Sequence, residues 1–160
     1  MSLESMISNL KKMRFLAHED DSIELLEEIL NEISQTANNK VIGDLCSVFH
    51  DEIDEPSIIG DLIKTIFYII ERNGIEEGLY ELIEGMNYIL PQARYCAKRL
   101  YRSLLATDDL IVPFINVLRK VIPSKKAEVI NILKEISDKQ SKQYSEKVNF
   151  IFKEVIRLEK

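Results

Sequence analysis

Apolar residues recur at steps of three and four along almost the whole chain. This spacing matches the 3.6-residue turn of an α-helix and gathers apolar side chains on one face of each helix. Only five glycines and four prolines interrupt the 160 residues. The chain is therefore predicted to be all-α, and its pattern requires no β-strand.

Breaks in this pattern divide the chain into nine candidate helices. They span about residues 3–17, 22–36, 39–52, 57–73, 75–90, 92–106, 109–122, 124–139 and 143–159. Asp54 or Glu55 before Pro56 marks one start, because the unpaired N–H groups and the dipole of a helix N-terminus favour oxygen acceptors and negative charge. Thr107 before Asp108 is a second start signal of this kind.

Three prolines stand at nearly regular spacing. Pro56, Pro91 and Pro123 are 35 and 32 residues apart, and each is expected to open a helix, where the missing N–H is not needed. An amphipathic helix precedes each proline, which gives three candidate pairs. Repeats of about 30–45 residues with two antiparallel helices are typical of α-solenoids. We predict one domain over 1–160, with eight or nine helices in antiparallel pairs as in HEAT or armadillo repeats; an irregular helical bundle is the alternative.

Charge is divided unevenly along the chain. Residues 18–84 contain eighteen Asp and Glu but three Lys and Arg, whereas residues 85–160 contain eight acids and fifteen bases. Crowded like charges weaken a compact fold, so a division of this size favours a surface whose field attracts a partner. We interpret the acidic part as a binding surface for a basic protein; an uneven solubilising surface is the alternative.

Ten residues are predicted to contact this partner. Carboxylates come from the connection before Pro56 and from the polar face of the 75–90 helix, and tyrosines set among charges supply contact area with little rotamer entropy to lose. The set comprises Asp51, Glu52, Asp54, Glu55, Tyr68, Glu77, Tyr80, Glu81, Glu84 and Tyr88. For each tyrosine, packing over a neighbouring helix is the alternative.

The apolar stripes of the same helices predict the core. Leu62, Ile66, Leu79, Leu82, Leu100 and Leu104 are expected to be buried. Cys46 and Cys96 lie inside apolar patterns without a CxxC motif, so we expect buried thiols. No stretch approaches the roughly 20 apolar residues that cross a bilayer, and the N-terminus lacks a secretory signal, so a cytoplasmic protein with no membrane partner is expected. The net charge of −6 argues against a nucleic-acid ligand.

Signals for catalysis are weak. His18 and the pair His50-Asp51 supply part of the H…HD…D ligand set of HD-type metal-dependent phosphohydrolases. The rest of the set is missing, because later acids such as Asp61 and Asp108 have no distinguishing context. No Glu-x-x-His motif of a di-iron bundle is present, and no glycine-rich loop precedes a helix. We expect no enzyme, with no catalytic residue, metal or cofactor; the HD-type enzyme is a remote alternative.

Features within residues 58–120 follow a recognisable order. A helix ends near the Gly-Ile-Glu-Glu-Gly turn at 74–78, and an acidic helix then closes at Leu90-Pro91. Ala97, Leu100, Arg102, Leu104 and Leu105 follow, before a short break and another helix. This order resembles bacterial immunity proteins of polymorphic and contact-dependent toxin systems, in particular the immunity protein 30 family. The resemblance implies a small helical scaffold that neutralises a co-produced toxin, often a nuclease, by direct binding.

The charge pattern agrees with what the resemblance implies. A nuclease holds phosphates in a basic groove, and an acidic helical scaffold is suited to occupy such a groove. We therefore expect an immunity protein that binds and neutralises a cognate secreted toxin domain, a basic nuclease, through its acidic surface. A helical-repeat adaptor that binds a basic protein without inhibiting it is the alternative.

Overall fold

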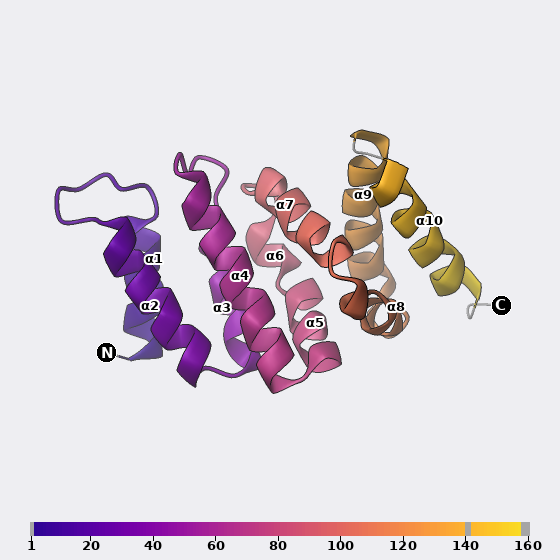
Figure 1. The fold of residues 1–160 in the computed structure, drawn as a ribbon, viewed down its shortest axis with the longest axis horizontal. Helices are drawn as coiled ribbons and strands as arrows, with labels where there is room; N and C mark the ends of the chain where they lie inside the picture. Colours follow the sequence, from indigo (N-terminus) through magenta and orange to yellow (C-terminus); the bar gives the residue numbers. More distant parts are fainter. Residues whose placement is uncertain (1, 140–141, 158–160) are drawn as a thin grey trace. The chain divides into compact units, whose positions relative to one another are not determined.

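The computed structural model of the protein describes residues 2–139 and 142–157, and within these ranges all regular secondary structure is helical (Figure 1). The helices are α1 Leu3–Met13, α2 Ile23–Thr36, α3 Ile42–Cys46, α4 Pro56–Asn73, α5 Ile75–Glu84, α6 Met86–Ile89, α7 Arg94–Leu105, α8 Ile111–Leu118, α9 Pro123–Lys139 and α10 Lys142–Arg157. Short 3-10 turns at Asn39–Val41 and Asp108–Leu110 lead into α3 and α8. The all-α prediction is confirmed.

The chain forms two compact units, residues 1–96 and 97–160. The first holds α1 to α6 and the start of α7, and the second holds the rest of the chain. The predicted core residues are fully buried, namely Leu62, Ile66, Leu79 and Leu82 in the first unit and Leu100 and Leu104 in the second. That part of the prediction is confirmed, while the single domain over 1–160 stays a prediction.

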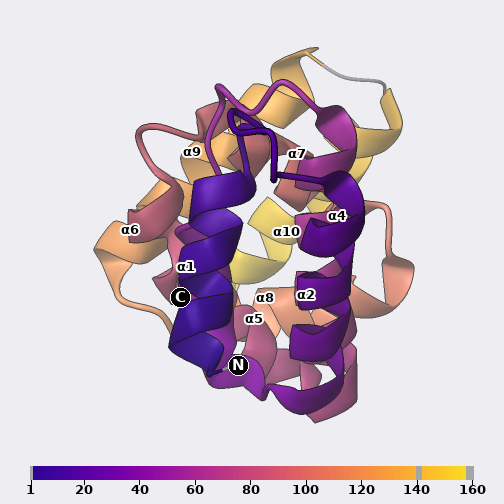
Figure 2. The same ribbon diagram turned by 90° about the vertical axis from the view of Figure 1, so that its left-hand side faces the viewer.

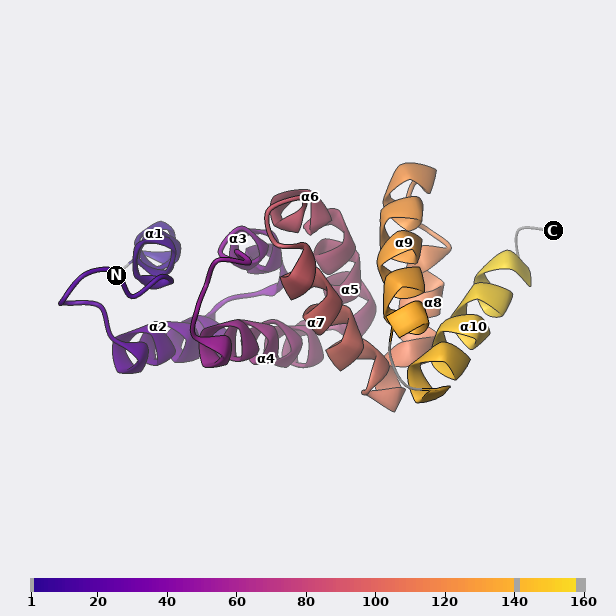
Figure 3. The ribbon, with the colours of Figure 1, turned by 90° about the horizontal axis from the view of Figure 1, so that it is seen from above.

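Two layers of helices make up most of the first unit. Figure 3 shows α2 and α4 in one row and α1 and α3 in the other, and Figure 2 shows α1 and α2 side by side at the front. The apolar stripe of α2, which includes Leu26 and Ile33, is buried, as is that of α4 with Ile58 and Leu62. An irregular bundle accounts for the same helices, so the HEAT-like solenoid stays a prediction.

Two of the three expected proline starts are present. Pro56 opens α4, and the Glu55 carboxylate accepts the N–H of Ser57 at 3.3 Å, as its position before the proline predicts. Pro123 opens α9. The expectation for Pro91 is wrong: it follows a cis peptide bond in a turn, and α7 begins only at Arg94.

The predicted helix over 39–52 is much shorter in the structure. Regular helix ends with α3 at Cys46, and the chain is irregular from 47 to 55. Val48, Phe49 and Ile53 in this irregular segment are nevertheless buried. Their apolar pattern therefore reflects burial rather than helix. Arg14 satisfies the end of α3, because its Nη1 donates to the carbonyls of Ser47 at 3.3 Å and Val48 at 3.1 Å.

The predicted helix over 75–90 is divided by Gly85 into α5 and α6. A β-carbon at Gly85 would lie 2.9 Å from Sγ of Cys46, so a larger residue would push α3 away. Gly78 has the same role toward α4, since its β-carbon would lie 2.6 Å from Cγ1 of Ile70. These two glycines let α5 pack closely against both helices.

The second unit is held by its own contacts. α10 packs against α8 and α9. The buried rings of Tyr101 in α7 and Phe114 in α8 lie 5.9 Å apart, measured between centroids. Nζ of Lys147 in α10 donates to the Leu105 carbonyl at 2.7 Å and to the Asp108 carboxylate at 3.0 Å. These contacts join the end of α7 to the helices that follow it.

Both cysteines are buried thiols, as predicted. Burial raises the pKa of Cys46 to about 12, because the thiolate would lose its hydration in this apolar setting. Within the described ranges, no helix is long and apolar enough to cross a bilayer.

Candidate functional site

The ten predicted contact residues all lie in the first unit, and none of them is buried. Tyr68, Tyr80 and Tyr88 expose 47%, 42% and 57% of their surface. About half of the surface of each tyrosine therefore remains open to a partner. The ten residues do not form one cluster, because they divide among the 47–55 connection, the groove beside α4 and the outer side of α5 and α6.

Within the connection, Asp51 differs from its acidic neighbours. Its two carboxylate oxygens accept the N–H groups of Tyr95 at 3.0 Å and Cys96 at 3.1 Å, in the first turn of α7. Its own N–H donates to the Gln92 carbonyl at 3.3 Å. A carboxylate at a helix N-terminus satisfies unpaired N–H groups and complements the dipole. Asp51 thus has a structural role that the sequence did not indicate.

The residues of the HD-type alternative lie in two different connections, His50 and Asp51 before α4 and His18 before α2. Nδ1 of His50 accepts the backbone N–H of Glu52 at 3.1 Å, and the His50 and Phe15 rings make a T-shaped contact with centroids 5.3 Å apart. His18 lies in the α1–α2 connection, where its backbone N–H donates to the Asp21 carboxylate at 3.1 Å. Across residues 2–139 and 142–157, no three His, Cys, Asp or Glu side chains gather where they could hold a metal ion.

A hollow of about 340 Å³ lies between α3 and the α5–α6 segment, and we call it the α3–α5 hollow. Its lining consists of Lys40, Gly43, Asp44, Glu81, Glu84, Gly85, Asn87 and Tyr88. The structure therefore brings Glu81, Glu84 and Tyr88 to one hollow, although the helix between Glu84 and Tyr88 is interrupted at Gly85. The hollow also contains Asp44 from α3 and Lys40 from the 3-10 turn before α3. These two residues reach the hollow because α3 packs against α5.

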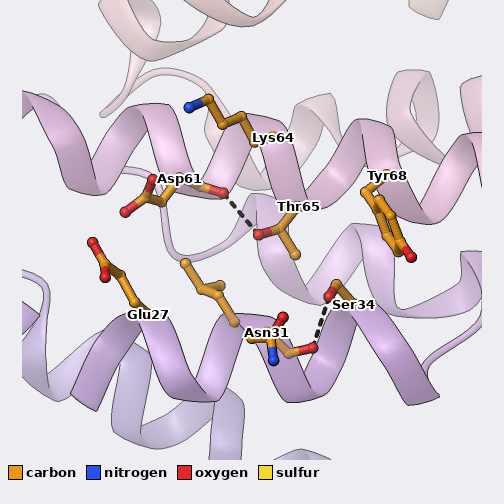
Figure 4. Close-up of a pocket in the computed structure, with 8 residues that line it drawn as sticks. Glu27, Asn31, Ser34, Asp61, Lys64, Thr65 and Tyr68 are labelled. Atoms are coloured by element: carbon orange, nitrogen blue, oxygen red, sulfur yellow. Dashed lines mark hydrogen bonds between the residues drawn. The ribbon is translucent and has the colours of Figure 1, made fainter. Parts of the chain in front are cut away.

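A second hollow, the α2–α4 groove, lies between two parallel helices and measures about 260 Å³ (Figure 4). It is lined by Glu27, Leu30, Asn31, Ser34, Asp61, Lys64, Thr65 and Tyr68. Of these residues, the sequence analysis predicted Tyr68 as a contact residue. It missed Glu27, because Glu27 and Asp61 are 34 residues apart and each lies on a polar helix face without a local motif.

The polar lining of the α2–α4 groove consists mainly of acceptors. Ser34 and Thr65 are only 7% and 8% exposed, and their hydroxyls donate to the carbonyls of Asn31 and Asp61, both at 2.7 Å. In Figure 4 the carboxylates of Glu27 and Asp61 point toward one another, while Lys64 points away from them. The groove therefore presents carboxylate and hydroxyl oxygens to whatever enters it.

Arg72 fixes the C-terminal end of this groove. Its guanidinium donates to the carbonyl of Gln35 at 2.9 Å and also to that of Ala37, at the end of α2. A cation at a helix C-terminus satisfies free carbonyls and complements the dipole. The relative position of α2 and α4, and with it the width of the groove, is held at this point by Arg72.

The described chain is helical, and its first unit is rich in acids. A family model described as Immunity protein 30 matches residues 12–112, which is more than half of the chain. The chain belongs to the immunity protein 30 family, and the resemblance seen within 58–120 is confirmed. This membership implies an immunity protein directed against a toxin. No curated protein and no solved structure matches the chain.

Proposed function

We propose that this protein neutralises a cognate secreted toxin domain by binding it directly, without catalysis of its own. The proposal rests on the family match over residues 12–112. This match covers nearly all of the acid-rich first unit. Immunity by direct binding needs a complementary surface and no catalytic group. The protein would act in the cytoplasm, where an incoming toxin meets its target.

The sign of the surface supports a basic partner. Three acids, Asp44, Glu81 and Glu84, line the α3–α5 hollow with the half-exposed Tyr88, against one base, Lys40. Glu52 and Asp54 add exposed carboxylates in the connection before α4. A nuclease carries a basic groove for phosphates, and a negative surface attracts such a groove over long range. A basic nuclease domain is therefore the toxin that we infer, with Tyr68, Tyr80 and Tyr88 as contact residues.

The test uses the toxin domain encoded beside the gene for this protein, co-expressed with charge-reversal variants. One set reverses Glu52 and Asp54, and a second reverses Glu77, Glu81 and Glu84. Asp51 and Glu55 are left unchanged, because each also caps a helix. A control set reverses Lys98, Arg99 and Arg102. Growth of the cells reports protection, and stopped-flow association at low and high salt reports steering.

We expect both acidic sets to slow association and reduce protection. Steered association approaches about 10⁸–10⁹ M⁻¹s⁻¹ and falls steeply with salt, because ions screen the field over roughly 10 Å at 0.1 M. The control set should associate at the wild-type rate. If the acidic variants protect fully while the control set fails, the proposed interface has the wrong sign. A complex in which the toxin stays active would instead identify an adaptor.

A further inference from the structure

Two like charges face each other across the α2–α4 groove without a cation between them. Figure 4 shows the Glu27 and Asp61 carboxylates pointing toward one another, with Lys64 turned away. Oδ2 of Asp61 is shielded from solvent and has no hydrogen-bond partner among the described residues. Leaving a shielded carboxylate oxygen unpaired is costly, more so beside a second carboxylate. The groove therefore has an unmet requirement for a positively charged donor.

The neighbouring hydroxyls add to the same requirement. Because Ser34 and Thr65 donate their hydrogens to carbonyls of their own helices, what remains on each oxygen is acceptor capacity. Both side chains are more than nine-tenths buried, and both line the groove. A ligand that carries several donors would thus meet acceptors from α2 and from α4 at once.

The walls of the groove suit the stem of a long side chain. Leu30 lines the groove at 2% exposure, and Tyr68 lies at one end with 47% of its surface open. A phenol ring and a leucine side chain favour contact with methylene groups, and the ring face attracts a cation. A single amino-acid side chain fits a hollow of about 260 Å³, whereas a folded segment does not.

We propose that the α2–α4 groove binds an arginine side chain of a partner protein, with its guanidinium between Glu27 and Asp61. A guanidinium presents five donors in one plane and pairs with carboxylates through two parallel bonds, which a lysine ammonium does not do. A metal ion is disfavoured, because no third His, Cys, Asp or Glu joins the two carboxylates within the described part of the chain. This inference rests on the proposed immunity function in one respect, which is that the partner protein is the toxin.

The probe is N-acetyl-arginine amide, titrated into the ¹⁵N-labelled full chain and followed by two-dimensional NMR. N-acetyl-citrulline amide, which has the same shape without the charge, is the control ligand. Arginine amide should shift the backbone signals of Ser34, Thr65 and Tyr68 saturably, with a dissociation constant on the order of 1 mM for one side chain. Citrulline amide should leave these signals unchanged. Equal shifts with both ligands would overturn the proposal.

Matched variants locate the binding. Asp61→Asn and Glu27→Gln keep side-chain size, and each should weaken arginine binding at least about tenfold, because a charged hydrogen bond is lost. Glu24→Gln on α2 and Glu71→Gln on α4 are exposed residues outside the groove lining and should bind like wild type. Undiminished binding by Asp61→Asn would show that the ligand sits elsewhere.

Thermal unfolding of the same variants gives an independent readout. Relief of the repulsion should leave the melting temperature of Asp61→Asn equal to or above that of the wild type, whereas a structural carboxylate would lower it. A lower melting temperature, or Mn²⁺ broadening of the Thr65 signal that Asp61→Asn removes, would overturn the arginine assignment. Since these experiments contain no toxin, they can fail while the protein still protects cells, and the two proposals are tested separately.

Discussion

The two units differ in the sign of their charge and in how they use their cations. Residues 1–96 contain nineteen acids and seven bases, whereas residues 97–160 contain eight acids and fourteen bases. Ion pairs of the second unit join Lys98 to Glu135, Arg119 to Glu154 and Lys147 to Asp108. In the first unit, Arg14 and Arg72 bind carbonyl oxygens at the ends of α3 and α2 instead. There, two of the few cations stabilise helix ends rather than neutralise carboxylates.

This comparison separates stability from recognition. If the acids of the first unit serve a partner, then its fold depends on the apolar core and on a few polar contacts, and most of its carboxylates contribute little. The second unit should depend on a similar core and gain slightly from its ion pairs. Four measurements test this division, beginning with the core.

Core truncation should have the largest effect and should be alike in both units. Leu82 in the first unit and Leu133 in the second are both completely buried. Replacing either with alanine should lower the free energy of unfolding by about 2–5 kcal/mol, through lost burial and a cavity. Denaturant unfolding followed by circular dichroism measures this loss. A change below about 0.5 kcal/mol for Leu82→Ala would mean that the core of the acidic unit is loosely packed.

Among the acids of the first unit, Asp51 should contribute more to the free energy of unfolding than its exposed neighbours. Asp51→Ala removes both acceptors at the start of α7 and should lower the free energy of unfolding by about 1–2 kcal/mol. Asp54→Ala, three residues along in the same connection, should change it by less than about 0.5 kcal/mol. Chemical denaturation of the two variants makes the comparison. Equal effects would remove the distinction between structural and partner-directed carboxylates.

Alkaline pH should weaken the first unit through Cys46. Its pKa is raised by burial to about 12 in the fold from an ordinary 9.0, so the unfolded chain releases this proton first. The stability linked to the thiol is present below pH 9 and is lost as pH rises toward 12. Between pH 9 and pH 10, wild type should lose about 1 kcal/mol more than Cys46→Ala. Urea unfolding at pH 8, 9 and 10 tests this, and parallel losses would contradict it.

The surface ion pairs of the second unit should have the smallest effect. Lys98 and Glu135 approach to 3.8 Å and are both partly exposed. Lys98→Met should lower the free energy of unfolding by about 0.2–1 kcal/mol, and 1 M salt should abolish the difference. Lys64→Met in the first unit is the matched control and should cause no loss, because Lys64 points away from the nearby carboxylates. A larger loss at Lys64 would contradict the comparison.

Local signals predicted much of the fold. The helical period identified every long helix, Glu55 before Pro56 marked the start of α4, and the apolar stripes identified buried residues such as Leu82 and Leu104. The period failed at 47–55, because Phe49 and its apolar neighbours are buried in an irregular segment. A pattern of apolar residues reports which side chains are buried and does not always report the backbone that buries them.

The candidate site was less accessible to sequence reasoning. The exposure of three tyrosines, Tyr68, Tyr80 and Tyr88, could be predicted from the polar faces of their helices. The face on which a side chain lies depends only on nearby positions in the sequence. The opposition of Glu27 and Asp61 depends on how two separate helices pack, and the cap made by Asp51 reaches Tyr95, 44 positions further along the chain. Contacts over such separations leave no periodic trace in a single sequence.

The cap that Asp51 makes on α7 limits the positions at which the 47–55 connection can gain or lose residues. Asp51 is held by α7, and Glu55 is held by the first turn of α4, so only residues 52–54 lie between two anchored positions. An inserted residue beside the exposed Glu52 or Asp54 would enlarge the loop and leave both anchors in place, whereas Ile53 between them is buried. An insertion between Cys46 and Asp51 would carry the carboxylate away from α7. Changes of chain length that keep both helix caps are therefore confined to three residues of this connection.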